Sequence, residues 1–139
     1  MTRIDFYRYA EDKLHVACRL AAKAFAQKKN VVVYDPDRAR LGEFDKRLWT
    51  FQAVGFVPHV FADSPLAAET PVILSANGES LPHHDVLINL ADEWPPFFAT
   101  FERVLEIVGA DDEDKVKARA RHAFYKDRGY DIQVRDLEG

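Results

Sequence analysis

The chain has 139 residues, of which 47% are hydrophobic and 30% charged, and its formal net charge at pH 7 is −4. This composition is that of an ordinary globular protein, and we expect one domain over residues 1–139. No apolar run approaches the length of about 18 residues that a transmembrane helix needs, and the acidic balance disfavours wrapping nucleic acid with the whole surface.

Strand and helix signals alternate along the chain. Short runs of β-branched and aliphatic residues predict strands, and apolar residues at spacings of three and four predict helices. The first half predicts a strand over Arg3–Tyr9, a helix over Lys13–Lys28, a strand over Val31–Tyr34, a helix that Asp35 caps and Pro36 opens and that ends near Trp49, and a strand over Phe56–Phe61. After a loop, the second half predicts strands over Val72–Ser75 and Val86–Leu90, a helix over Glu113–Arg128 and a strand over Tyr130–Val134. Between Leu90 and Glu113 we expect a further helix, which Pro95-Pro96 opens and Gly109 ends. Its apolar face carries Phe97, Phe101, Val104, Leu105 and Val108.

This alternation predicts an α/β fold, a three-layer Rossmann-like sandwich with a mostly parallel sheet. Such folds usually bind nucleotides at the carboxyl ends of their strands. Here the first strand-to-helix turn has no glycine, and it places Glu11 and Asp12 where a phosphate would sit. The six glycines form neither a dinucleotide-binding motif nor a P-loop. We therefore expect no bound cofactor.

Catalytic and metal-binding motifs are sparse. The single Cys18 excludes an internal disulfide, lies on the apolar stripe of its helix and fits a cytoplasmic protein, so we expect a packed core thiol. The run His83-His84-Asp85 is a poor chelate, because adjacent residues of an extended segment point to opposite sides. His59 is expected at a strand edge. We expect neither a catalytic site nor a metal. The alternative is a small α/β enzyme or nucleotide-binding protein whose site combines Glu11, Asp35, Asp85 and the histidines.

The helix predicted over Glu113–Arg128 concentrates positive charge. It carries six Lys or Arg and three acids, a net of +3, so the rest of the chain carries −7. Its expected buried stripe is Val116, Ala120, Ala123 and Phe124, one flank is Lys115, Arg119, His122 and Lys126, and the other flank is Lys117, Arg121 and Arg128. One interpretation is that these charged residues form an ordinary solvent-exposed face of the helix. Like charges four residues apart repel, however, which favours a receptor for an anionic partner. Direct nucleic-acid binding is a third interpretation, disfavoured because no aromatic stacking platform accompanies the cations.

Large aromatic residues gather where the second helix ends. Trp49 and Phe51 follow the helical segment Lys46-Arg47-Leu48, and Phe56 comes soon after. They are either core residues or a surface on which another protein docks.

Several segments, in this order and spread over nearly the whole chain, resemble the chi subunits of bacterial DNA polymerase III. They are Phe6-Tyr7, Asp45-Lys46-Arg47-Leu48-Trp49, Phe56-Val57-Pro58-His59, Val86-Leu87-Ile88-Asn89-Leu90 and the stretch from Ala118 to Tyr130. The resemblance implies a Rossmann-like fold without a nucleotide site. It also implies a non-catalytic accessory subunit in DNA replication, which links the clamp loader and its psi subunit to single-stranded DNA-binding protein and meets nucleic acid mainly indirectly.

The resemblance also assigns roles to residues. Chi-like proteins bind the acidic C-terminal tail of single-stranded DNA-binding protein, which ends in Pro-Phe and a free carboxylate. Lys115 and Arg119 match the tail-binding positions, Arg121 and Lys126 match nearby basic positions, and Val116 and Ala120 are expected to wall a slot for the phenylalanine ring. The psi-binding surface is expected on Trp49, Phe51 and Phe56. The chain departs from the family pattern in a shorter region before the first helix and a different loop after His59.

Overall fold

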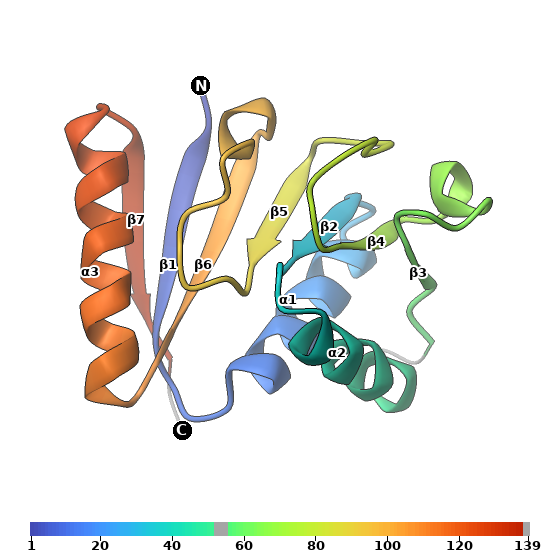
Figure 1. Ribbon diagram of the computed structural model, residues 1–139, viewed down its shortest axis with the longest axis horizontal. Helices are drawn as coiled ribbons and strands as arrows, with labels where there is room; N and C mark the ends of the chain where they lie inside the picture. The colour runs from blue at the N-terminus through green and yellow to red at the C-terminus, as the bar shows by residue number, and fades with distance from the viewer. Residues whose placement is uncertain (52–55, 138–139) are drawn as a thin grey trace.

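The computed structural model describes residues 1–51 and 56–137, and its strands form one sheet (Figure 1). Seven strands lie in the order β3-β4-β2-β5-β6-β1-β7, and every neighbouring pair is parallel. The strands are β1 (Arg3–Ala10), β2 (Val31–Tyr34), β3 (His59–Phe61), β4 (Val72–Ser75), β5 (Val86–Asn89), β6 (Arg103–Gly109) and β7 (Asp131–Asp136).

Helices cover both faces of this sheet. They are α1 (Lys13–Ala26), α2 (Arg38–Thr50), α3 (Asp112–Asp127) and the short 3-10 turns η1 (Ala67–Glu69) and η2 (Phe98–Thr100). The helices α1 and α2 lie on one face, and α3 lies on the other with the loop that contains η2 (Figure 1). The predicted three-layer α/β fold is confirmed. Across the described ranges, no helix has the length and apolar character required to cross a membrane.

The sheet has a hydrophobic core on each of its two faces, and the short central strands contribute side chains to both cores. In β2, Val31 and Val33 pack against α1 and α2, whereas Val32 and Tyr34 face the other layer. Every residue of this strand is buried. A continuous apolar run is what a parallel strand covered on both faces requires, so the interpretation of Val31–Tyr34 is confirmed.

The helix predicted after Pro95-Pro96 is wrong. Only the turn η2 forms there, and Arg103–Gly109 is the strand β6, which pairs with β1 and β5. Aromatic and aliphatic residues recur by chance at helical spacing from Phe97 to Val108. The run of aliphatic residues in β6 is buried on both sides, and pairing with two distant strands outweighs the local periodicity.

Two further boundaries differ from the prediction for a reason that the structure shows, and most of the others shift by one or two residues. Asp37, not Asp35, caps α2, since its carboxylate accepts hydrogen bonds from the backbone N–H groups of Ala39 and Arg40. Asp35 is instead fully buried and ion-paired with Arg40. The predicted strand over Phe56–Phe61 shortens to His59–Phe61. Pro58 just before it has no N–H to donate to the sheet.

Candidate functional site

The helix α3 packs on the sheet through a different side from the one predicted. Its buried residues are Ala118, Arg121 and Tyr125. Of the expected apolar seam, Val116 is 60% exposed and Ala120 and Ala123 are also exposed, whereas Phe124 is half-buried and packs against the core. The prediction failed because it assumed that charged residues stay outside.

A buried polar network explains the actual seam. The carboxylate of Glu106, in the central strand β6, is fully buried and accepts hydrogen bonds from Arg121 Nε (2.9 Å), Tyr125 Oη (2.7 Å) and Asn89 Nδ2 (3.0 Å). Burial raises the pKa of Glu106, and the Arg121 charge opposes that rise. Because every partner donates, the ionised carboxylate is the form that this network satisfies. Arg121 is therefore a structural residue, and its expected place on an exposed flank is wrong.

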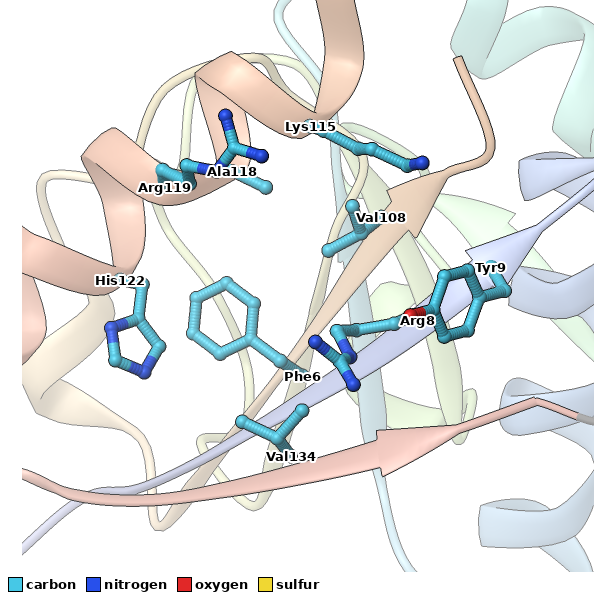
Figure 2. Close-up of a pocket in the computed structure, with 9 residues that line it drawn as sticks. All are labelled: Phe6, Arg8, Tyr9, Val108, Lys115, Ala118, Arg119, His122 and Val134. Atoms are coloured by element: carbon cyan, nitrogen blue, oxygen red, sulfur yellow. The ribbon is translucent and has the colours of Figure 1, made fainter. Parts of the chain in front are cut away.

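The cationic row beside this seam borders a pocket. Its cavity of about 320 Å³ is lined by Phe6, Arg8, Tyr9, Val108, Lys115, Ala118, Arg119, His122 and Val134. Figure 2 shows Lys115 and Arg119 reaching from α3 on one side, Val134 from β7 on the other, and Phe6 between them. The pocket therefore joins an apolar interior to cations from two elements.

Positive charge dominates the rim of this pocket. Among the residues that the structure describes, neither Lys115 nor Arg119 forms an ion pair. Arg8 donates two hydrogen bonds to Asp136, at 2.7 and 3.1 Å, and these bonds hold the pKa of Asp136 below its usual value. The rim thus retains two uncompensated cations, and it suits a small anionic group.

The backbone at Tyr9 is strained where it meets the pocket. Its φ angle is +66°, and the pairing of β1 with β6 shifts register between Tyr7 and Ala10. A residue other than glycine rarely adopts this conformation, and such a bulge redirects a side chain. Lys115 Nζ lies 5.8 Å from the Tyr9 ring centroid, and the Arg8 guanidinium carbon lies 5.1 Å from it. This backbone conformation thus places an aromatic ring next to two cations of the rim.

The sequence predicted one wall of this pocket and missed the other. Lys115, Arg119 and His122 form the expected row, and Lys126 lies exposed one turn further along it. Val116 and Ala120 lie on the exposed outer face of α3, so the apolar wall comes from other residues. The residues missed were Phe6, Arg8, Tyr9, Val108, Ala118 and Val134. The alternation of Ile4, Phe6 and Arg8 along β1 was the available signal.

A second surface forms where α2 ends. Trp49 is 54% exposed and Phe56 is 62% exposed, with ring centroids 5.4 Å apart. His59 is buried beneath Trp49 at 4.4 Å between centroids, and its Nε2 is 3.2 Å from Asp45. The interpretation of Trp49 as a core residue is therefore wrong. Phe51 is half-buried and packs on His15 instead, at 5.7 Å. We call the pair Trp49 and Phe56 the aromatic surface.

The residues of the alternative enzyme site are not brought together. Asp35 follows the carboxyl end of β2, whereas Asp85 precedes the amino end of β5. Because these two strands are parallel, the two residues lie at opposite ends of the strands. Each carboxylate already has a structural partner, Arg40 for Asp35 and the backbone N–H of Asn30 for Asp85. Cys18 is buried in the core as expected, and burial raises its pKa to about 12. No cluster of three or more potential metal ligands occurs within residues 1–51 and 56–137.

Comparison with known proteins identifies relatives over most of the chain. The family described as DNA polymerase III chi subunit, HolC, matches residues 1–133. A protein of Pseudomonas aeruginosa named DNA polymerase III subunit chi is 40% identical over 137 residues, which cover 96% of this chain and 95% of that protein. Proteins of the same name from Haemophilus influenzae and Escherichia coli are 32% and 28% identical, covering 88% and 86% of this chain and 85% and 82% of their own lengths.

Proposed function

The chain belongs to the family of DNA polymerase III chi subunits, accessory subunits in DNA replication without a catalytic activity of their own, and from this premise we propose how it connects its partners. In this proposal, the pocket under α3 binds the acidic C-terminal tail of single-stranded DNA-binding protein. The aromatic surface binds the psi subunit of the clamp loader. The protein then acts as a link between the polymerase assembly and coated single strands.

The pocket carries this proposal because its chemistry complements the end of such a tail. Phe6, Val108 and Val134 offer an apolar interior for one phenylalanine ring, whose burial contributes about 1.5–3 kcal/mol. Lys115 and Arg119 offer charge-assisted hydrogen bonds to the terminal carboxylate and to the acids before it. A ligand without the ring would leave the apolar interior empty, and a ligand without the carboxylate would leave Lys115 and Arg119 unpaired.

The arrangement of the two surfaces supports a linking role. The pocket is built on β1, β6, β7 and α3, whereas the aromatic surface adjoins β3 at the other edge of the sheet. Six strand spacings separate these edges, which is roughly 29 Å at about 4.8 Å per spacing. The two surfaces therefore do not overlap, and both can be occupied at the same time.

The tail-binding proposal is tested with a labelled peptide ending in acidic residues, Pro-Phe and a free carboxylate. Fluorescence anisotropy measures its affinity for the wild type, for Arg119→Glu and for the control Arg38→Glu, an exposed cation on α2. We expect a large loss with Arg119→Glu only, and weaker binding as salt rises, because exposed charges are screened. Deleting the terminal Phe should weaken binding at every salt concentration. Equal affinities for the three proteins would contradict the proposal.

The psi proposal has its own test. Trp49→Ala should leave the melting temperature nearly unchanged, because about half of the Trp49 surface is exposed to solvent. The same substitution should weaken the complex with psi. The matched control is Trp94→Ala, whose ring stacks on Phe124 beside α3, away from the aromatic surface. Truncation of a buried tryptophan costs roughly 3–5 kcal/mol, so a loss of that size would show that Trp49 stabilises the fold itself and would contradict a pure docking role. Unchanged psi binding would remove the aromatic surface from the interface.

A further inference from the structure

On one face of the sheet, the helical layer does not extend as far as the edge strand β7. All-parallel sheets normally have both faces covered, because their strands are apolar on both sides. On the face that carries α1 and α2, the main contacts of these helices are with β2, β4, β5 and β6. On that face α1 reaches Tyr7 and Ala10 of β1, whereas the edge strand β7 lies beyond α1 and α2 (Figure 1).

A groove runs along α1 beside β1. Two hollows of about 380 Å³ and 190 Å³ share Tyr7, Leu20 and Lys23, so they form one continuous depression, which we call the α1 groove. The larger hollow is mostly apolar, and its floor is formed by Tyr7, Val16, Leu20, Ala22, Phe51 and Leu137. Since α1 has 14 residues, the groove has room for a partner helix of about four turns.

Cations stand on both walls of the α1 groove. Arg19 and Lys23 project from α1 into the larger hollow. On the sheet side, three arginines from three strands converge on the fully buried carboxylate of Asp5. They are Arg3 at 3.4 Å, Arg103, which also donates to the Tyr7 hydroxyl at 3.2 Å, and Arg135 at 3.7 Å.

One carboxylate cannot neutralise three guanidinium groups, so this wall keeps surplus charge and unused N–H donors. The acids that border the groove, Asp85 and Glu102, line only its smaller hollow. The larger hollow therefore has an apolar floor with Arg19 and Lys23 on its α1 side. Arg103 and Arg135 do not line this hollow, but they lie beside its Tyr7 on the sheet side.

We propose that the α1 groove binds an amphipathic helix of a partner protein, with an apolar stripe on the floor and acidic residues along both flanks. Such a helix extends the layer of α1 toward β7, and its charges complement Arg19 and Lys23 on one side and the arginines around Asp5 on the other. A second copy of this chain does not fit, because a two-fold contact would set these cations against themselves. Single-stranded nucleic acid is disfavoured by the aliphatic floor, which offers no row of exposed rings for stacking. The groove is separate from the pocket under α3 and from the aromatic surface.

The test uses a designed 14-residue helical peptide, labelled with fluorescein, with Leu along one stripe and Glu on both flanks. Anisotropy compares the wild type with Arg19→Glu/Lys23→Glu and with the matched control Arg38→Glu/Lys46→Glu, two exposed cations of α2. The first pair should weaken binding about tenfold, and the control pair should leave it unchanged. A version with Lys in place of Glu should not bind. Equal affinities for all three proteins, or displacement by the tail peptide described above, would overturn the proposal.

The occupant in the cell is identified by a photoreactive amino acid at Ala26, an exposed residue of the groove wall. Cross-linking to an acidic amphipathic helical segment, lost in Arg19→Glu/Lys23→Glu, supports the proposal. Cross-linking to a second copy of the chain or to nucleic acid, or the absence of any product, refutes it. Because neither outcome depends on Lys115 or Arg119, failure here leaves the tail-binding proposal standing.

Discussion

Truncating Arg121 to alanine distinguishes a structural cation from a binding one. The guanidinium is buried, lies 2.9 Å from Glu106 and donates a further bond of 2.8 Å to the carbonyl of Asp92. Arg121→Ala would leave the Glu106 carboxylate buried without its counter-charge. Breaking a buried pair in this way costs roughly 3–5 kcal/mol, a large part of a typical total stability of about 5–15 kcal/mol. The loss comes from the stranded charge more than from the missing contact.

Urea unfolding, followed by circular dichroism, measures this loss. With a slope of about 1–3 kcal/mol per molar urea, the midpoint should fall by roughly 2 M. The control is Arg119→Ala on the same helix, which should stay within about 0.5 kcal/mol of the wild type. The double change Arg121→Met/Glu106→Leu should recover most of the stability, because it removes both charges and fills their space. A loss below about 1 kcal/mol for Arg121→Ala would show that the residue is an ordinary surface cation.

Two further predictions concern Cys18 and Tyr9. Because burial raises the pKa of Cys18 to about 12, its thiol stays protonated at pH 8, and a thiol reagent should modify it only as the protein unfolds; rapid modification of the native protein would contradict its place in the core. Tyr9→Gly should raise stability by roughly 1 kcal/mol, because glycine adopts a φ of +66° without strain. A loss of stability in thermal unfolding would show that the Tyr9 ring contributes more than its backbone costs.

The sequence predicted the architecture better than the identity of each element. Strands β2 and β4 were predicted with their observed bounds, because their buried apolar runs have no helical competitor. Strand β6 was mistaken for a helix, since its neighbours in the sheet come from residues about 100 positions upstream and from β5. Such pairing is non-local, so no window of sequence around Arg103–Gly109 contains the partners that decide its conformation.

The candidate site shows the same limit at the level of side chains. The cationic row of Lys115, Arg119 and His122 follows from helical spacing alone, and it lines the pocket. The seam of α3 does not follow from spacing, because the burial of Arg121 depends on Glu106 in a strand that was itself mispredicted. The apolar wall depends on β1 and β7, which lie at opposite ends of the sequence. A projection of one helix cannot supply residues that the fold brings from elsewhere.

In this chain, carboxylates of the protein itself fill the position where open parallel sheets usually bind a ligand, and this helps to explain where the two candidate surfaces lie. In an open parallel sheet, that position is the crevice where adjacent strands send their connections to opposite faces, and here it lies between β1 and β6. Asp12 caps α1 there, and Asp111 caps α3. Asp114 accepts a bond of 2.6 Å from the backbone N–H of Gly109 and pairs with Lys13 at 3.2 Å. Both helix N-termini thus already hold carboxylates from the chain itself, and a phosphate would meet negative charge at each. With this crevice used for structure, the unpaired cations and exposed rings lie at the two edges of the sheet, where the surfaces are open enough to meet another protein.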